Sequence, residues 1–170
     1  MIRGTTIAAW ALVLMTGPAS AVNCQNNIPA SNPDSAYTVH GDGTVTETRT
    51  GLMWKVCAEG QTWSTGACTG TAATYAWDAA LATAQASTFA GYSDWRLPNL
   101  KELRSLVEEC RMVPAINDTV FPGAPSTDFW SGSPLTLSSG YTWVVYFGDG
   151  YANGYARNLI KSVRLVRGGQ

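Results

Sequence analysis

Hydrophobic and polar positions alternate in the first part of the chain. Residues 37–56, YTVHGDGTVTETRTGLMWKV, hold short runs of Thr, Val, Tyr and Trp that are broken at Gly41-Asp42-Gly43 and at Thr50-Gly51. Such runs, separated by turn formers, are typical of strands joined by hairpins. We therefore expect two or three short strands here, after an irregular lead over residues 22–36 that is rich in turn-forming residues.

The spacing of apolar positions changes to a helical one from residue 74. Thr74 is a suitable N-cap, and the segment YAWDAALATAQA follows it. One face of this segment gathers apolar side chains at helical spacing: Trp77, Ala80, Leu81 and Ala84. The pattern predicts a helix of about three turns.

A second helix is predicted after Pro98. Proline disfavours helical angles at the residue before it, Asn99 can cap, and Glu102 stands three residues later, as in a capping box. The predicted buried stripe is Leu100, Leu103, Leu106, Val107 and Cys110. The predicted solvent-facing positions are Lys101, Arg104 and Glu108.

Trp95 and Arg96 stand just before this helix, in the stretch GYSDWRLPNLKELRSLV. The simplest interpretation is structural: a Trp wedged between helices and an Arg that bridges to a carboxylate or to free carbonyls. We also expect structural roles for Trp77, Pro98, Trp130 and Trp143, because the last two lie inside strand patterns.

The last third reads as strands. FWSGSP, YTWVVYF and SVRLVRG are short strand candidates separated by Gly, Ser and Asn, and no helical pattern lies between them. The order strands, helix, helix, strands predicts an α+β domain in which two helices pack on a mostly antiparallel sheet.

The N-terminus resembles an export signal. Arg3, an apolar run over residues 7–15 and the small residues Ala19-Ser20-Ala21 predict a signal peptide at residues 1–21. No segment has the roughly 18 apolar residues that cross a bilayer. A lipid anchor at Cys24 is the alternative, but Asn23 stands where such signals need a small residue. We expect an exported protein, periplasmic or at the cell surface, with one domain over residues 37–169.

Composition narrows the choice of partner. Charged residues make up 14% of the chain, against about 25% in typical soluble domains, and the formal charge of −1 becomes −2 without Arg3. A chain with this charge is not expected to bind nucleic acid by bulk electrostatics.

The four cysteines, Cys24, Cys57, Cys68 and Cys110, favour two disulfides in an exported chain. Three pairings are possible. We favour Cys57 with Cys68, which flank a Gly- and Ser-containing loop, and therefore Cys24 with Cys110. A zinc site is disfavoured, because the spacings are wide and His40 is the single histidine.

No catalytic pattern emerges. His40 lies in a turn, none of the common hydrolase, zinc-protease or nucleotide-binding motifs occurs, and Asp42 with Glu47 is too few ligands for calcium. We therefore predict no catalytic residue, no metal and no cofactor.

A binding surface is better supported. The C-terminal part mixes aromatic side chains with small polar ones, as paratopes and sugar-binding surfaces do. The predicted ligand-binding residues are Tyr141, Asp149, Tyr151, Asn153, Tyr155, Arg157, Asn158 and Lys161, and we expect Tyr151, Asn153 and Tyr155 in an exposed Gly-rich loop within residues 149–161.

The last twenty residues hold four cations and no acid: Arg157, Lys161, Arg164 and Arg167. If two or three share a face, they could recognise sulfated or carboxylated glycans. Alternatively, Arg164 and Arg167 pair with carboxylates elsewhere.

Several ordered motifs resemble those of the collagen-like-protein C-terminal domain family: GDGTVTETRTGLMWKVCAEGQTW, GYSDWRLPNLKELRSLV, FWSGSP, TWVVYFGDG and VRLVRGG. The likeness spans about residues 37–169. Arg96-Leu97-Pro98 followed by a helix also resembles the corresponding segment of formylglycine-generating-enzyme-type proteins. This second resemblance implies a C-type-lectin-like α+β fold.

The family resemblance implies an exported protein and an adhesin type that forms trimers and binds sulfated glycosaminoglycans. The oxidase activity of formylglycine-generating enzymes is not implied, because no cysteine follows Cys110 to bind copper. The motifs with which lectins bind calcium are also missing from the sequence.

Three functions follow as hypotheses. The first is adhesion to a glycan or a protein on another surface. The second is a cell-envelope enzyme that acts on polysaccharide, with Asp128 and Asp149 as a carboxylate pair. The third is a structural role in an envelope assembly. Within the first, the Tyr, Asn, Ser, Gly and Asp bias of residues 131–158 also resembles the variable surface of diversity-generating-retroelement targets.

Overall fold

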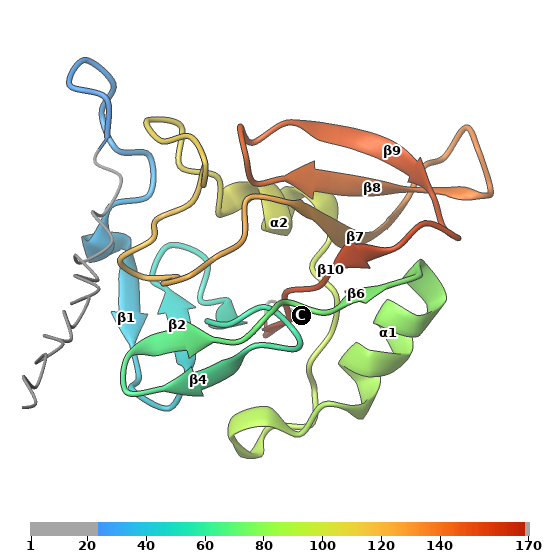
Figure 1. The fold of residues 1–170 in the computed structure, drawn as a ribbon, viewed down its shortest axis with the longest axis horizontal. Coiled ribbons are helices and arrows are strands. Elements are labelled where there is room, and N and C mark those ends of the chain that lie inside the picture. The colour runs from blue at the N-terminus through green and yellow to red at the C-terminus, as the bar shows by residue number, and fades with distance from the viewer. Residues whose placement is uncertain (1–23, 169–170) are drawn as a thin grey trace, which may run out of the picture.

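The computed structural model describes residues 24–168 and confirms an α+β architecture with two α-helices and mostly antiparallel sheets (Figure 1). The predicted signal peptide lies outside the described residues. Among the residues described, no helix is long and apolar enough to cross a membrane.

The early strands form a sheet with the end of the chain. β1 (Tyr37–Val39), β2 (Thr44–Glu47), β3 (Met53–Lys55) and β11 (Val166–Arg167) lie side by side in this order, all antiparallel. Asp42 Oδ1 closes the first turn, since it accepts hydrogen bonds from Thr44 N at 2.9 Å and Thr44 Oγ1 at 2.6 Å. The expected hairpins are confirmed, and the closing strand pairs Val166 with Trp54.

A five-stranded sheet forms the other half of the molecule. Its order is β6 (Thr74–Tyr75), β10 (Lys161–Ser162), β7 (Asp128–Pro134), β8 (Tyr141–Tyr146) and β9 (Ala152–Ala156). Neighbours are antiparallel except β10 with β7. A third, two-stranded sheet joins β4 (Thr62–Ser64) to β5 (Ala67–Thr69) inside the cysteine loop.

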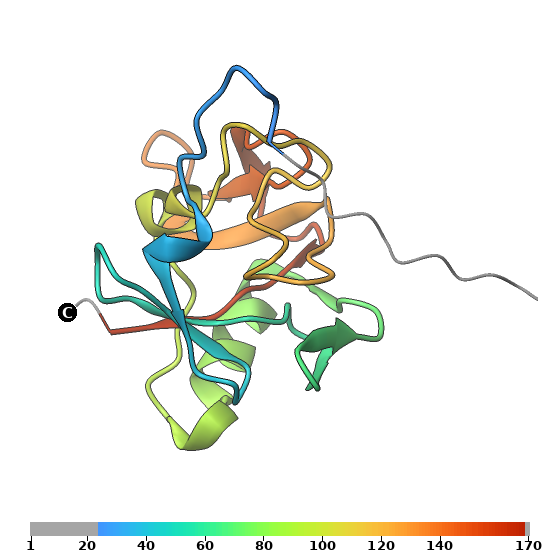
Figure 2. The same cartoon turned by 90° about the vertical axis from the view of Figure 1, so that its left-hand side faces the viewer.

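The two helices cover opposite faces of the five-stranded sheet (Figure 1). α1 (Trp77–Ala86) packs Ala80 and Ala84 against Trp130 and Val144. α2 (Leu100–Ser105) packs on the other face, in the cluster that contains Phe129. Two short 3-10 helices, η1 (Asp34–Ala36) and η2 (Phe89–Gly91), complete the elements. Figure 2 shows the lead of the chain running up past the edge of this core.

The predicted start of the first helix is wrong by two residues. Thr74 begins strand β6, and Ala76 occupies the cap position without a side-chain hydrogen bond. Leu81, expected in the buried face, is 37% exposed. Pairing of Thr74 with Ser162 across the sheet outweighs the local capping preference.

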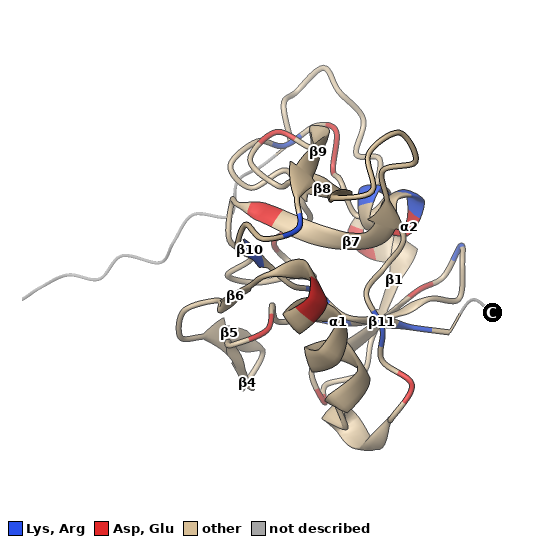
Figure 3. Ribbon diagram, turned by 90° about the vertical axis from the view of Figure 1, so that its right-hand side faces the viewer, with Lys and Arg blue, Asp and Glu red and all other residues tan. Residues whose placement is uncertain are grey.

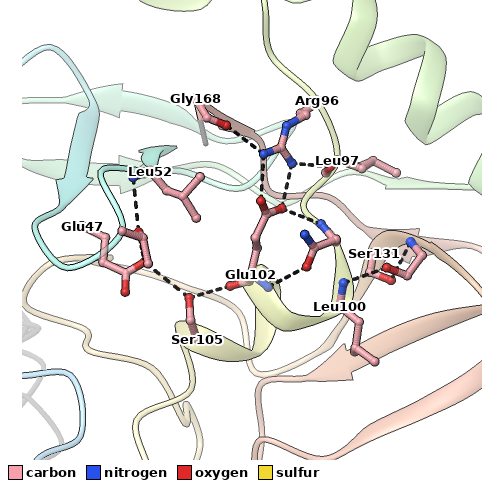
Figure 4. Close-up of polar contacts among 12 residues, drawn as sticks. Glu47, Leu52, Arg96, Leu97, Leu100, Glu102, Ser105, Ser131 and Gly168 are labelled. Carbon is pink, nitrogen blue, oxygen red and sulfur yellow. Dashed lines mark hydrogen bonds and ion pairs between the residues drawn. The ribbon is translucent and has the colours of Figure 1, made fainter. Parts of the chain in front are cut away.

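The second helix begins as the sequence predicts (Figure 4). Asn99 Oδ1 accepts from Glu102 N at 2.9 Å, and Glu102 Oε2 accepts from Asn99 N at 2.7 Å, which completes a capping box. Arg96 Nη1 and Nη2 donate to the two oxygens of Glu102 at 2.7 and 2.8 Å, and Nη2 also donates to Gly168 O at 2.9 Å. Arg96 thereby joins the helix start to the last strand.

Trp95 and Pro98, on either side of this Arg, are both buried. Trp95 is 3% exposed and belongs to the apolar cluster of α1, which also contains Ala80, Ala84, Trp130 and Val144. It donates its Nε1 hydrogen to Phe89 O at 3.0 Å. Trp77 is half-buried and donates its Nε1 hydrogen to Ser131 O at 2.9 Å. Trp77 thus links the start of α1 to β7, and Trp95 links the segment before α2 to η2.

Glu108 is the main correction to the predicted second helix. The helix ends at Ser105, so Glu108 is off its solvent face and is only 1% exposed. Its Oε1 accepts from Ser31 N at 2.7 Å and Ser31 Oγ at 2.9 Å, and its Oε2 accepts from Asn32 N at 2.9 Å. These contacts dock the N-terminal lead on the core.

Both disulfides are as predicted: Cys24 with Cys110 and Cys57 with Cys68. The first fixes the start of the lead beside Glu108. The second closes the hairpin of β4 and β5, in which Cys68 lies opposite Trp63.

Candidate ligand-binding surface

The middle of the segment expected to be an exposed loop is a strand. Residues 152–156 form β9, which pairs with β8 in continuous antiparallel register from Tyr141↔Ala156 to Val145↔Ala152. The turn before β9 places Gly150 at φ +82°, a left-handed conformation that favours glycine, and a Cβ there would overlap Val107. The backbone between residues 149 and 161 is therefore held by the sheet and by the end of the α2 region.

Cross-strand pairing brings a row of polar and aromatic side chains to one face of the five-stranded sheet. Asp128 lies opposite Tyr146, and Tyr146 N donates to Tyr151 O at 2.8 Å. On the other side Lys161 lies opposite Tyr75, and Lys161 Nζ reaches Asp128 Oδ2 at 2.5 Å. Directly paired residues share a face, so the row extends from β6 across β10, β7 and β8 to the residue before β9. We call these five residues the tyrosine row.

The tyrosine row is open at its β8 and β9 end. Tyr151 is 65% exposed and Tyr146 is 39% exposed. A side chain at Gly148 would overlap the ring of Tyr146, so the missing Cβ lets this ring lie against the chain. Asn153, exposed, follows Tyr151 on the same face. These groups present aromatic surface and an amide to solvent from paired backbone.

The β6 and β10 end of the row is more enclosed. The side chains of Lys161 and Asp128 are 15% and 21% exposed. Lys161 Nζ also lies 4.1 Å from the ring centroid of Tyr155, which is half-buried against the α1 cluster. Tyr75 is half-buried, and burial raises the pKa of its phenol, with a further rise from the charge of Glu59. This end of the row therefore carries the partly buried Lys161–Asp128 ion pair and the neutral phenol of Tyr75.

Four of the predicted ligand-binding residues meet on this face: Tyr151, Asn153, Tyr155 and Lys161. The other four lie elsewhere or are engaged. Tyr141, 43% exposed, points to the opposite face because it is an odd number of residues from Tyr146 on the same strand. Asp149 Oδ1 accepts from Tyr151 N at 2.9 Å within the turn. Asn158 is exposed after β9.

Arg157 is the fourth of these residues. Its guanidinium carbon lies 4.2 Å from the ring centroid of Trp77, and within residues 24–168 its buried Nε has no hydrogen-bond partner. The contact with Trp77 holds this cation beside α1, away from the exposed tyrosines.

Sequence reasoning left three members of the row out of the predicted site: Tyr75, Asp128 and Tyr146. Tyr146 had a usable signal, since it shares its parity on β8 with Val144 and lies at the exposed strand end. Tyr75 and Asp128 had none, because they join the row only through β10, which lies between β6 and β7.

The four cations near the C-terminus do not form a common face. Arg167 pairs with Asp94 at 2.7 Å and lies 3.9 Å from the ring centroid of Tyr92. Arg164 is buried and donates from Nη1 to Lys55 O at 3.2 Å and to Val56 O. The alternative of pairing with carboxylates is therefore right for Arg167 and wrong for Arg164. Figure 3 shows the charged residues of the described part of the chain scattered over the ribbon, without a continuous basic band there.

Trp130 and Trp143 differ in burial. Trp130 is fully buried, and its Nε1 donates to Tyr75 O at 2.7 Å. This hydrogen bond fixes the backbone of Tyr75, a member of the tyrosine row. Trp143 points to the α2 side and is half-buried, so its placement in the core is only partly right.

Other candidate groups are engaged in local structure. His40 Nε2 contacts Thr46 Oγ1 at 2.8 Å. The described residues contain one cluster of metal-ligating type, Cys24, Glu108 and Cys110, but both cysteines are in the disulfide. Asp128, named above with Asp149 as a carboxylate pair, is ion-paired with Lys161.

A separate hollow of about 520 Å³ lies between α1 and residues 93–97, lined by Leu81, Gln85, Ser93, Asp94 and Trp95 among others. Its charged members Asp94 and Arg96 are already paired with Arg167 and Glu102. The charged groups beside this hollow are therefore engaged within the chain.

The family model of the Lcl C-terminal domain matches residues 43–167, a span that contains all five residues of the tyrosine row. A comparison with curated proteins finds no match.

Proposed function

Because the chain belongs to the Lcl C-terminal domain family, we propose that it is an exported binding domain of C-type-lectin-like fold. Its ligand is a glycan or a protein on another surface, and its contact surface is the open end of the tyrosine row with Asn153. One observation carries the proposal: Tyr146 and Tyr151 lie side by side, exposed, on backbone that is paired on the sheet.

Two exposed aromatic rings suit a ligand with flat apolar faces and polar edges. The C–H face of a sugar ring stacks on an aromatic plate, while its hydroxyls find partners such as the Asn153 amide. Fixed aromatic groups lose little conformational entropy on binding, because the strand already orders them. A tyrosine pair in a mobile loop would lack this advantage.

The charges favour an uncharged ligand over a sulfated one. Lys161 is neutralised by Asp128 at 2.5 Å, and Arg157, Arg164 and Arg167 are held by an aromatic ring, backbone carbonyls and Asp94. To bind a sulfate, Lys161 would have to give up a partly buried ion pair. We therefore place neutral saccharides first among the ligand classes.

The test is a glycan array probed with the wild-type protein and with the double variant Tyr146→Ala/Tyr151→Ala. We expect the double variant to lose at least about tenfold in affinity, since each stacking contact of this kind contributes roughly 1 kcal/mol. The matched control is Tyr141→Ala, which removes a tyrosine of similar exposure from the opposite face. The array is run with and without a chelator, because calcium dependence separates this surface from a metal-dependent lectin site.

The control should bind as the wild type does, and all three proteins should melt within a few degrees of each other. Retained binding by the double variant, or an equal loss in Tyr141→Ala, would place the ligand elsewhere. Capture of sulfated glycans alone would overturn the preference for neutral ligands.

A further inference from the structure

The longest open sheet edge in the described part of the chain belongs to β9. The order of the five-stranded sheet leaves β9 with β8 as its one neighbour, and Figure 1 shows β9 along the margin of the molecule. β9 has five residues, whereas the other edge strands have two or three.

Two hydrogen bonds show which backbone groups of β9 point outward. Tyr146 N donates to Tyr151 O at 2.8 Å, and Arg157 N donates to Gly140 O at 3.0 Å. In an antiparallel pair the hydrogen-bonded residues alternate, so residues 151, 153, 155 and 157 face β8. The amide groups of Ala152, Gly154 and Ala156 therefore point away from the sheet.

The β9 edge lacks the features that usually protect an edge strand from pairing with another strand. Natural edge strands are protected by lysine, proline or a β-bulge. The β9 sequence ANGYA has no charged residue and no proline, and its register with β8 is unbroken over five pairs. Two outward backbone groups are engaged within the chain: Gly154 N donates to Asn153 Oδ1 at 2.8 Å, which would have to release it, and Ala156 O accepts from Leu159 N at 3.1 Å, which leaves its second lone pair free.

We propose that a second copy of this chain pairs with β9, antiparallel and around a twofold axis at Gly154. The residues whose backbone groups point outward are Ala152, Gly154 and Ala156. This sequence is the same in both directions, as a twofold axis at Gly154 requires. The twofold axis then places Ala152 opposite Ala156 of the second copy and Gly154 opposite its own equivalent. Neither pair adds bulk or like charge, and up to about six backbone hydrogen bonds form.

The charges at the two ends of β9 are compatible with the antiparallel orientation, with the Arg157 guanidinium held against Trp77. Asp149 precedes β9 and Arg157 follows it, so the two ends of the strand carry opposite charges. Antiparallel pairing brings the acidic end of one copy toward the basic end of the other. Parallel pairing would place like charges together, which is unfavourable.

Exposed apolar side chains concentrate around the same edge. Of the eleven exposed large hydrophobic residues among those described, six lie between residues 137 and 160: Leu137, Tyr141, Tyr146, Tyr151, Leu159 and Ile160. Leu159 and Ile160, 44% and 64% exposed, follow the end of β9, and Tyr151 precedes its start. The antiparallel pair brings these ends together and buries more apolar area than the strands alone.

The dimer joins two five-stranded sheets into one and sets the two tyrosine rows on the same side of it. This last consequence rests on the proposed function, whereas the pairing itself does not. A strand pair with a small apolar border is below the size of a permanent interface, so we expect reversible association that depends on concentration.

Sedimentation velocity over a range of protein concentrations tests the pairing, because residue 154 meets its own copy. Gly154→Lys and Gly154→Glu each place like charges opposite each other, and each should weaken the dimer by at least about tenfold. An equimolar mixture of the two should recover a heterodimer. Gly154→Ala is the matched control, since any Cβ at this position meets the flexible tip of Leu135 at 2.9 Å.

Hydrogen exchange of the wild-type protein gives a second measurement that needs no variant. The amides of Ala152 and Ala156 should become protected as concentration rises, while those of Asn153 and Tyr155 should not change. A wild type that stays monomeric at every concentration overturns the proposal, as does a Gly154→Lys protein that associates as well as Gly154→Ala. Both measurements are made without ligand, so their failure is distinguishable from failure of the glycan test.

Discussion

Single buried charges show how this protein uses ionisable residues for structure. Arg164 is 1% exposed, and its guanidinium carbon lies 4.8 Å from the ring centroid of Phe121. Burial lowers the pKa of Arg164, and the nearby Tyr37 opposes this shift. Such a cation cannot meet a ligand at the surface. Its role is to tie the carbonyl groups of Lys55 and Val56 to the core.

Glu108 gives a prediction at the same scale. Its carboxylate accepts from the amides of Ser31 and Asn32, and in the described residues no Lys or Arg forms an ion pair with it. Glu108→Gln would turn an amide N–H toward these donors. We expect a loss of roughly 2 to 4 kcal/mol in the free energy of unfolding, measured by urea denaturation.

The control for this variant is Glu109→Gln, which changes the neighbouring, exposed carboxylate. Glu109 contributes its backbone N–H to Ser31 Oγ at 3.0 Å, a bond that the substitution leaves in place. Its unfolding free energy should stay within about 0.5 kcal/mol of the wild type. Equal losses in both variants would show that the lead does not depend on the buried carboxylate.

At the scale of the element, α2 is too short to be stable by propensity. It has six residues, while isolated helices are marginal even at about twelve to fifteen. The capping box and the Arg96 contact fix its first turn, and Leu103 and Leu106 anchor it in the core. Because α2 packs on β7 and β8, its stability supports the sheet that carries the tyrosine row.

The pH dependence of stability should report on this helix start. Burial favours the neutral acid, but hydrogen bonds from Arg96 and the Asn99 amide outweigh it and hold the pKa of Glu102 below its ordinary 4.5. A lowered pKa in the folded state stabilises the protein above about pH 4.5, and this contribution is lost as pH falls through the folded value.

Glu102→Gln should therefore be less stable than the wild type at pH 7, by roughly 1 to 2 kcal/mol. The difference should shrink as urea unfolding is repeated at decreasing pH down to about 3. Parallel curves for the two proteins across this range would mean that the carboxylate of Glu102 does not contribute through its charge.

At the scale of the whole molecule, two disulfides close loops of very different length. The Cys57–Cys68 bond spans 11 residues and closes one hairpin, whereas the Cys24–Cys110 bond spans 86 and joins the lead to the end of the α2 region. Beside it, Asn117 Nδ2 donates to Asn32 O at 3.0 Å, so side-chain hydrogen bonds hold the same junction.

The two disulfides should differ in their effect on stability. Loop-closure entropy gives roughly 4.6 kcal/mol for the longer span and roughly 3 kcal/mol for the shorter. The pair Cys24→Ala/Cys110→Ala should therefore lower the unfolding free energy more than Cys57→Ala/Cys68→Ala, by urea denaturation under oxidising conditions. A larger loss from the short-span pair would show that the lead is held mainly by the Glu108 contacts.

The sequence alone was sufficient for the second helix start and for the cysteine pairing, although the local cap signal at Thr74 failed. Asn99 and Glu102 are three residues apart, so their capping box could be predicted from spacing, and the disulfide pairing followed from four cysteines and one short loop. The strand patterns of the last third were also readable. The likeness of the whole to C-type-lectin-like folds stays a prediction.

Only the tertiary structure decided which side chains share a surface. Tyr75 and Asp128 join one row because β10 lies between β6 and β7, a pairing of segments far apart in the chain. Glu108 is buried because residues more than 70 positions earlier fold over it. The physical reason is the same for both. Local hydrogen bonds are encoded in neighbouring residues, whereas strand order and docking depend on the packing of the entire core.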